Sequence, residues 1–587
     1  MNKKNIIIKL IMCFFVSFAW MNIGGLESTN ILLLCTFGAG FIVLSYRDAV
    51  AQKDTYNKKI RISAIILGAI FSLLYACFAD LSGGLENKAF ILIYEVSTVA
   101  GLFFMFKTLL DVGILKAVEF AGEKKNLTHN DFSLKILLCY TCIIYICCIP
   151  FFALNFPGVL TVDSLSQLGQ VMGIVERSNH HPWVHTAIIG LFYNIGYGLT
   201  TSAYVGIACY TVFQILMVGL SVGYAIECMY EAGIGRGVRN ALLICFIMLP
   251  YNLMYAVTMW KDILFTMSVL VFTITVIRIN SSEYESTRKT GLRDSIIFVI
   301  SSLFMCVLRH NGFYAFIATV VIWLFMKRKT LKRYIVLSMA VIFISVLCSG
   351  PVMKACKIAP GEYVYNMCMP LQQIGRVIAL GEEITPEQTE WLEKVNTLDY
   401  VRAGFDLQCA DPMFAWVLDG DEEYFDSHKA EFIKIWIEIG IKHPLTYMKA
   451  FGDLTKGYWA PMNPQQTVYF GMSDNDMGLY PKPVIEGPVL IKINELITKF
   501  YGMIPVYGMF YSMGSFFWLL LIFGAICIAG GRTQKLFAFL PSLMLTFTLF
   551  IATPLVADVR YGYALLVILP YLAVYILFCK NEKEMEQ

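Results

Sequence analysis

Residues 136–167 read ILLCYTCIIYICCIPFFALNFPGVLTVDSLSQ, and this stretch decides the fold. No charged side chain interrupts residues 136–154, a length close to the roughly 20 apolar residues with which a helix crosses a bilayer. A polar loop with Pro157 and Asp163 follows at once. The sequence therefore predicts a membrane-spanning helix that delivers an acidic loop to one face of the membrane.

Similar apolar runs recur along the whole chain, for example at residues 62–78, 204–226 and 563–577. Hydrophobic residues make up 57% of the chain, charged residues 15%, and the mean hydropathy is +0.63, beyond the average for soluble domains. We expect an all-α polytopic membrane protein with about fourteen transmembrane helices. The first run follows Lys3 and Lys4 without a small-residue cleavage site and is expected to be retained.

The basic loops predict the orientation, because Lys and Arg concentrate in short cytoplasmic loops. Basic residues recur at positions 3–9, 47–61, 116–125, 288–293, 327–333, 532–535 and 580–583. Their alternation with the apolar runs predicts a multi-pass protein of the cell membrane with both termini in the cytoplasm. It also places the loop that begins at Asn155 outside.

One segment, residues 181–197, conflicts with this alternation. If it crossed the membrane, Arg236 and Arg239 would lie outside, together with other basic loops. We predict that residues 181–197 lie at the outer interface without crossing, a depth that suits their His, Trp and Tyr side chains. The alternative is a true span, with residues 204–253 folded differently.

With this topology, five short polar stretches reach the same outer face. They are NFPGVLTVDSLSQ (155–167), SNHHPWVH (178–185), MWKD (259–262), RHNG (309–312) and ADVRYGY (557–563). Single charged residues at span ends are commonly lipid-headgroup anchors, and Asp163 could simply cap a helix. Their confinement to one face indicates a site for polar chemistry.

The chain divides into four parts by composition. Residues 1–130 form an N-terminal transmembrane module, residues 131–350 a transmembrane core with a first outer loop at 155–182, and residues 512–587 the last transmembrane helices. The interval 351–511 lacks convincing spans and is expected to be a mainly helical extracytoplasmic domain.

Within that domain, Thr385, Pro386 and Gln388 predict a capped helix start, and residues 425–441 predict an amphipathic helix that ends near His443. Residues 456–470 and 479–488 are rich in proline, aromatic and amide side chains. They suit either a carbohydrate-binding surface or a well-turned loop.

The cysteines, the histidine spacing and the net charge do not indicate a further functional site. Most of the 17 cysteines lie in apolar runs, where cysteine behaves as a small hydrophobe. His181 and His185 have helical ligand spacing but no obvious third ligand, so we predict no metal site. A net charge of +3 is too small to indicate nucleic acid as a partner.

The outer stretches fit transfer chemistry at a phosphate. A carboxylate such as Asp163 can act as a general base toward an acceptor hydroxyl, and Glu176 is its nearest rival in the sequence. Guanidinium groups at Arg309 and Arg560 can grip phosphate oxygens in a two-pronged manner. The remaining candidates are His180, His181 and Lys261 for the same phosphate, with Asp262, His310 and Asp558 in support.

The stretches FPGVLTVDSLSQ, HHPWVHTAIIG, MWKD and LRHNGFY resemble the GT-C glycosyltransferases, which include the protein mannosyltransferases and the lipid A aminoarabinose transferases. Together with MPLQQIGRV and KHPLTYMKAFGDLTKGYWAP, they more specifically resemble an uncharacterised bacterial family of GT-C-like membrane proteins. The resemblance covers roughly residues 155–461; the spans before about Asn126 lie outside it.

The resemblance implies a GT-C-like fold and transfer of a sugar from a polyprenyl-phosphate carrier to a glycan or cell-wall acceptor at the outer leaflet. It gives Asp163 the role of catalytic base or of organiser of metal and acceptor. Some members carry two acids where this chain has Asp163 alone, so a divalent metal is possible but not required. A transporter or flippase of lipid-linked saccharides and a non-catalytic assembly protein are the alternatives.

Overall fold

The computed structural model describes residues 3–579, apart from residues 78, 80, 82–86, 124–126, 128, 281–290, 328–331, 463–467, 487, 489–491, 494, 497–498, 500–502 and 505. Within these residues the chain is helical and has no β-strand, only four isolated bridges, which confirms the predicted all-α class. Several basic positions used for the orientation (124–125, 288–290, 328–331 and 580–583) lie outside the described residues.

The apolar runs form long helices, as predicted for a multi-pass membrane protein. Ten helices in the described part of the chain are long and apolar enough to cross a membrane. The pair α9 (Arg236–Met248) and α10 (Pro250–Val257) would make an eleventh, bent by 67°. Three shorter apolar helices are α13 (His310–Lys327), α24 (Met513–Ala529) and α26 (Tyr563–Phe578). The number of crossings, about fourteen, stays a prediction.

Helix α11 (Lys261–Asn280) is the central element, and nearly all of its side chains are buried. It packs against α8 (Ala203–Glu231), α12 (Gly291–Leu308) and α26. Phe272 contacts the rings of Phe298 and Phe316, each at 5.6 Å between centroids. Because α11 is enclosed on all sides, its first residue, Lys261, has a fixed position.

The two ends of α11 carry separate groups of charges. At the far end Arg278 pairs with Glu231 of α8 and, at 3.2 Å, with Asp294 of α12. At the near end stand Lys261 and Asp262, and no ionisable residue occurs between positions 263 and 277. A rise of 1.5 Å per residue puts the two groups about 25 Å apart.

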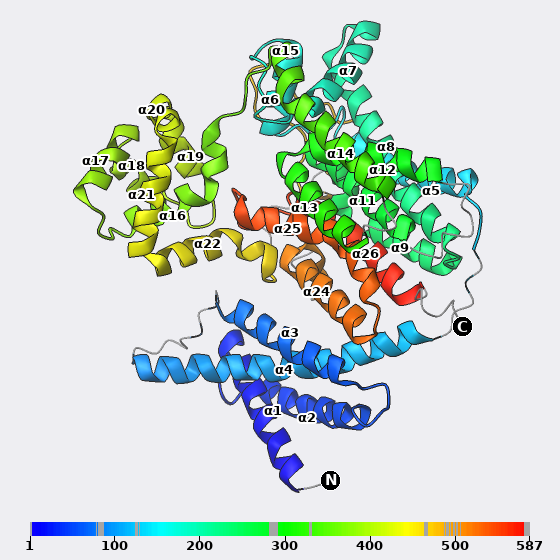
Figure 1. The fold of residues 1–587 in the computed structure, drawn as a ribbon, viewed down its shortest axis with the longest axis vertical. Coiled ribbons are helices and arrows are strands. Elements are labelled where there is room, and N and C mark those ends of the chain that lie inside the picture. The colour runs from blue at the N-terminus through cyan, green and yellow to red at the C-terminus, as the bar shows by residue number, and fades with distance from the viewer. Residues whose placement is uncertain are drawn as a thin grey trace.

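Helix α7 (Trp183–Thr200) forms a hairpin with α8. Its Gly196 approaches Gly206 so closely that a Cβ on Gly196 would lie 2.6 Å from the Val205 carbonyl oxygen. Gln214 of α8 donates to the Thr258 carbonyl at 2.7 Å, close to Lys261, so the first turns of α8 extend beyond that end of α11. Figure 1 shows α7 projecting from the helices at this end. This placement fits a segment that stays at one face, and that it does not cross the membrane stays a prediction.

The N-terminal module consists of α1 (Lys3–Gly24), α2 (Ile31–Val50), α3 (Lys58–Ala76) and α4 (Lys88–Gly122), drawn in blue in Figure 1. It meets the rest of the protein through α24, where Phe71 stacks on Trp518 at 4.1 Å. Helix α5 (Leu134–Leu154) then starts the core.

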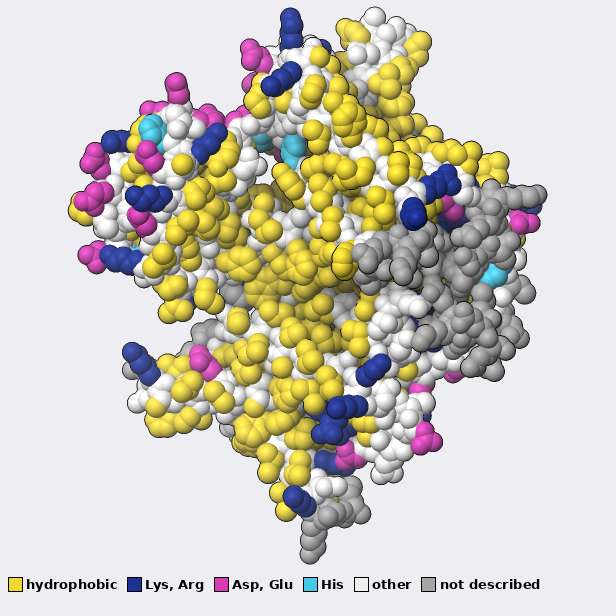
Figure 2. Space-filling view, in the orientation of Figure 1, with side chains coloured by type: hydrophobic (Ala, Val, Ile, Leu, Met, Phe, Trp, Pro, Cys, Tyr) yellow, Lys and Arg dark blue, Asp and Glu magenta, His cyan; other side chains and the backbone are white. Residues whose placement is uncertain are grey.

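The expected extracytoplasmic domain contains a compact helical unit, called the outer domain below. It comprises α16 (Cys368–Ala379), α17 (Pro386–Val395), α18 (Leu398–Gly404), α19 (Asp411–Leu418), α20 (Glu422–Ser427), α21 (Lys429–Lys442) and α22 (Pro444–Trp459), around its own hydrophobic core. Figure 2 shows charged side chains gathered over this domain and a broad hydrophobic surface over the other helices.

Two local predictions for this domain can be compared with the structure. The capping box between Thr385 and Gln388 is present at the start of α17. The helix predicted over residues 425–441 is wrong as one unit, because the chain breaks at His428 between α20 and α21. Its predicted end is confirmed, since α21 ends at Lys442, and α22 starts directly at Pro444.

After α22 the chain returns to the core instead of staying in the outer domain. Leu160 donates its amide to the Gly471 carbonyl at 2.9 Å, and Ser473 donates to the Leu160 carbonyl at 2.8 Å. Residues 463–467 of the proline-rich and aromatic region lie outside the described residues, and residues 479–486 are irregular. The described part of that region is a loop against residues 153–160; carbohydrate binding there stays a prediction.

The topology is tested by cysteine accessibility in a variant whose native cysteines are replaced. Asp399→Cys, on the exposed surface of the outer domain, should react with an impermeant maleimide added to intact cells. Asp54→Cys, in the exposed loop between α2 and α3, should react only after the membrane is opened. Labelling of both positions from outside would contradict the predicted orientation.

Candidate functional site

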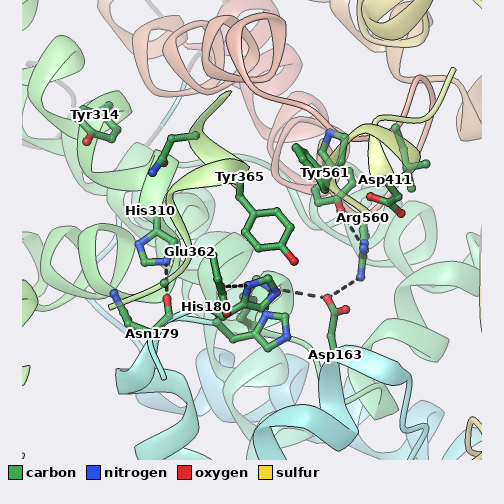
Figure 3. A pocket seen from close by; sticks show the side chains of 17 residues that line it. Asp163, Asn179, His180, His310, Tyr314, Glu362, Tyr365, Asp411, Arg560 and Tyr561 are labelled. Carbon is green, nitrogen blue, oxygen red and sulfur yellow. Dashed lines mark hydrogen bonds and ion pairs between the residues drawn. The ribbon is translucent and has the colours of Figure 1, made fainter. Parts of the chain in front are cut away.

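The five polar stretches predicted to share one face meet around a single cavity of about 620 Å³. Its walls come from the starts of α6 (Val162–Met172), α11 and α13, the segment before α7, the loop between α25 (Leu540–Ile551) and α26, and the outer domain. Figure 3 shows their side chains pointing into this space. Of the predicted residues, Asp163, His180, His181, Lys261, His310 and Arg560 line it.

Asp163 is held at the start of α6 by a local capping arrangement. Thr161 and Ser164 form a capping box, and Ser164 Oγ also donates to the Met259 carbonyl at 2.8 Å. Trp260 Nε1 donates to Thr161 Oγ1 at 2.8 Å. The same contacts therefore fix Asp163 relative to Lys261, the next residue after Trp260.

Asp163 lies between two cations. Its Oδ2 is 3.0 Å from Arg560 Nη1 and 3.7 Å from Lys261 Nζ. Burial alone would raise the pKa of this carboxyl, but the charges of Lys261 and Arg560 outweigh burial and hold the pKa of Asp163 well below its usual range. Asp163 is therefore a stable anion and a weak base in this state.

Two further ion pairs support the residues that line the cavity. Arg309 Nη1 lies 3.0 Å from Asp262 Oδ1, and Arg560 Nε lies 3.1 Å from Asp558 Oδ2. None of Arg309, Asp262 and Asp558 lines the cavity. Arg309 also stacks over the Tyr561 ring at 5.1 Å, so it supports the wall that Arg560 and Tyr561 form.

His181 acts as a neutral partner of Lys261. Its Nδ1 accepts a hydrogen bond from Lys261 Nζ at 3.0 Å. Burial and the neighbouring Lys261 lower the pKa of His181 to about 2. Because Nδ1 accepts, the ring proton sits on Nε2, where it can be donated in a hydrogen bond to a ligand.

The remaining histidines connect the first loop to other elements. His180 Nδ1 lies 3.1 Å from Glu362 Oε2 of the segment that leads into the outer domain. His310 Nε2 donates to the Asn179 carbonyl at 3.2 Å. Both therefore order the wall around residues 178–181, in addition to lining it.

The outer domain and the segment that leads into it contribute residues that the sequence did not reveal. Glu362, Tyr365, Asn366, Asp411 and Phe414 also line the cavity. No local pattern marked these positions, because they reach the cavity only through docking of the domain. Glu176, the rival to Asp163, is exposed and does not line the cavity.

A divalent metal has no ready place at Asp163, whose carboxylate already faces Arg560 and Lys261. Among the described residues, the group with metal-ligating geometry is Glu227, Cys228 and Glu231. It lies near Arg278, at the far end of α11. Of the two histidines with helical ligand spacing, His185 bonds to Gln167 and Tyr210, and His181 bonds to Lys261.

Comparison with known proteins gives one match. A family model described as a family of unknown function, DUF6020, matches residues 176–587, more than two thirds of the chain. No curated protein and no solved structure matches the chain. The matched region contains every cavity-lining residue named above except Asp163. The chain therefore belongs to the DUF6020 family.

Proposed function

We propose that this protein is a membrane glycosyltransferase that moves a sugar from a polyprenyl-phosphate carrier to an extracytoplasmic acceptor such as a cell-envelope polymer. The observation that carries the proposal is the carboxylate of Asp163 between Arg560 and Lys261 in a cavity. An anion held by two cations at that place marks a position where a phosphate can bind.

The charge balance indicates how the donor binds. Lys261, Arg309 and Arg560 are already matched by Asp163, Asp262 and Asp558. A donor phosphate therefore displaces Asp163 and takes its place beside Arg560 and Lys261. The Nε2 proton of His181 adds a neutral donor, and charge-assisted bonds to the phosphate stabilise it as a leaving group.

In the transfer step an acceptor oxygen attacks the anomeric carbon of the sugar. The bond from that carbon to the phosphate oxygen breaks, and its electron pair stays on the phosphate, next to Arg560 and Lys261. Asp163, displaced from the cations but still an anion, stabilises the positive charge that develops at the sugar ring. This gives Asp163 an electrostatic role that fits its low pKa.

The surface beside the cavity supports a lipid-linked donor. Tyr314 of α13 lines the cavity and is 67% exposed, and Val321 and Phe325 on the same face of α13 are 61% and 76% exposed. Ile551 on the neighbouring α25 is 71% exposed. An isoprenoid chain can follow this apolar flank while its phosphate enters the cavity.

A transporter of lipid-linked saccharides would need polar groups along a path through the membrane. Helix α11 runs from the cavity to the far face without an ionisable residue at positions 263–277. This favours chemistry at one face over transport. A non-catalytic assembly protein is separated from a transferase by a transfer assay.

The proposal is tested with purified protein in nanodiscs, undecaprenyl-phosphate-linked radiolabelled sugars and isolated cell-envelope glycan. Arg560→Lys keeps the charge but loses the planar fork, so transfer should fall by about a hundredfold or more and undecaprenyl phosphate should bind more weakly. Arg309→Lys, behind the wall, should have the smaller effect. Arg402→Lys on the exposed face of the outer domain is the matched control.

Unchanged transfer and unchanged undecaprenyl phosphate binding in Arg560→Lys would contradict the phosphate site. Absence of both transfer and undecaprenyl phosphate binding in the native protein would contradict the proposed function as a whole.

Asp163→Asn should lower transfer by about a hundred- to thousandfold, because the anion that faces the sugar ring is lost. Undecaprenyl phosphate should bind at least as tightly as to the native protein, since its competitor for Arg560 and Lys261 is neutral. The measurement compares initial rates with binding isotherms, and thermal unfolding checks the fold. Glu176→Gln, the same change at an exposed acid, should keep full activity.

If Asp163→Asn transferred sugar normally while Glu176→Gln did not, the essential carboxylate would be Glu176.

A further inference from the structure

The cavity is lined by two chemically different sets of residues. The wall at the helix ends carries Lys261 and Arg560. The outer domain and the segment that leads into it add Glu362, Tyr365, Asn366, Asp411 and Phe414, none of them a cation, and Figure 3 shows Asp411 on the side of Arg560. A phosphate and a polyhydroxyl compound therefore find different partners in one cavity.

Asp411 differs from the other carboxylates of this region. Asp163, Asp262, Asp558 and Glu362 each have a cationic or histidine partner within 4 Å. Asp411 forms no ion pair in the part of the chain that the structure describes, and its side chain bonds to Cys409. Burial raises the pKa of Asp411 above its ordinary value and outweighs the opposing effects of Cys409 and Arg560, so this carboxylate accepts a proton more readily than Asp163 does.

Tyr365 occupies the middle of the space. Its ring packs edge to face with His180 at 4.6 Å and with Phe414 at 4.9 Å. Figure 3 shows the ring projecting into the cavity with its hydroxyl turned toward the side of Asp163. The flat ring of Tyr365 suits the face of a sugar, and the amide of the neighbouring Asn366 suits its hydroxyls.

Backbone pairing fixes this wall relative to the cations. Asn179 donates its amide to the Ala359 carbonyl at 2.8 Å, close to Glu362. Ala410 donates to the Pro554 carbonyl at 2.8 Å, and Val556 donates to the Gln408 carbonyl at 3.0 Å. The second pairing joins the residues next to Asp411 to the loop that carries Arg560. It therefore fixes the position of Asp411 relative to Arg560.

We propose that the wall formed by Glu362, Tyr365, Asn366 and Asp411 is the acceptor site and that Asp411 takes the proton from the attacking hydroxyl. The inference rests on the proposed transferase function and deepens it. The acceptor oxygen forms the new bond to the anomeric carbon, and its proton moves to the Asp411 carboxylate. The bond to phosphate breaks, and its electron pair leaves with the phosphate held by Arg560 and Lys261.

The charge of the wall also defines the class of acceptor. The two carboxylates of this set, Glu362 and Asp411, repel a phosphate-rich polymer and accept a neutral or amine-bearing glycan. Transfer should therefore proceed to a neutral or amino-sugar oligosaccharide. A poly(glycerol phosphate) chain should be a poor acceptor, and equal transfer to it would overturn this assignment.

The test uses the full-length protein in nanodiscs and the labelled donors described above. A base with a raised pKa is active only when deprotonated, so native transfer should rise with pH through a midpoint above that of an ordinary aspartate. Asp411→Asn should lower transfer by about a hundred- to ten-thousandfold and remove this rise. Asp411→Glu should retain part of the rate with a displaced midpoint, and undecaprenyl phosphate binding should be unchanged in both.

Asp399→Asn, the same change on the exposed surface of the outer domain, should leave the rate and the pH profile unchanged. Native-like transfer and pH dependence in Asp411→Asn would overturn the role of Asp411 and leave the transferase function standing. Loss of undecaprenyl phosphate binding in Asp411→Asn would also overturn it, since that result indicates a structural role. A native protein that neither binds undecaprenyl phosphate nor transfers sugar overturns both proposals together.

Discussion

The side chain of Arg560 is only 12% exposed, and a guanidinium in that position must be matched by negative charge. Asp163 and Asp558 supply it from either side, at 3.0 and 3.1 Å, and Nη2 donates to the Tyr561 hydroxyl at 2.8 Å. Removing one partner of such a buried pair leaves an uncompensated charge and costs roughly 3–5 kcal/mol. The helix α6 and the loop before α26, 397 residues apart at their contact, are therefore tied together by one side chain.

The rest of the cavity follows from where the helices end. Helix α11 is enclosed by apolar neighbours along its length, and its charges occur only at its ends. Lys261 and Asp262 therefore pair with charged residues at the end of α11 where α6, α13 and the loop before α26 also meet. The outer domain pairs through its backbone with residues 554–556, and the segment that leads into it pairs with residues 177–179.

The sequence predicted the helix-end half of the site and missed the other half, for a physical reason. Alternation of basic loops is a one-dimensional signal that assigns a face to every loop, so it brought Asp163, Lys261, His310 and Arg560 to one side without any contact information. It cannot distinguish residues that line the cavity from residues that support the lining. Arg309, expected at the phosphate, does not line the cavity and pairs with Asp262. Asp411 and Tyr365 depend on how a separate helical unit docks, and no periodicity encodes that.

The family match begins at residue 176, yet the geometry extends the unit further upstream. Arg560 lies within the match, but its partner Asp163 and the loop at residues 155–160 precede it. That loop makes several backbone hydrogen bonds with the matched region, for example from Val159 to the Val257 carbonyl at 2.9 Å and from Leu160 to the Gly471 carbonyl at 2.9 Å. A matched segment cut at residue 176 would leave Arg560 with half of its counter-charge and would remove the contacts of Thr161 and Ser164 with the residues just before α11. The smallest unit that can hold this cavity therefore begins at α5, and only the module α1–α4 lies outside it.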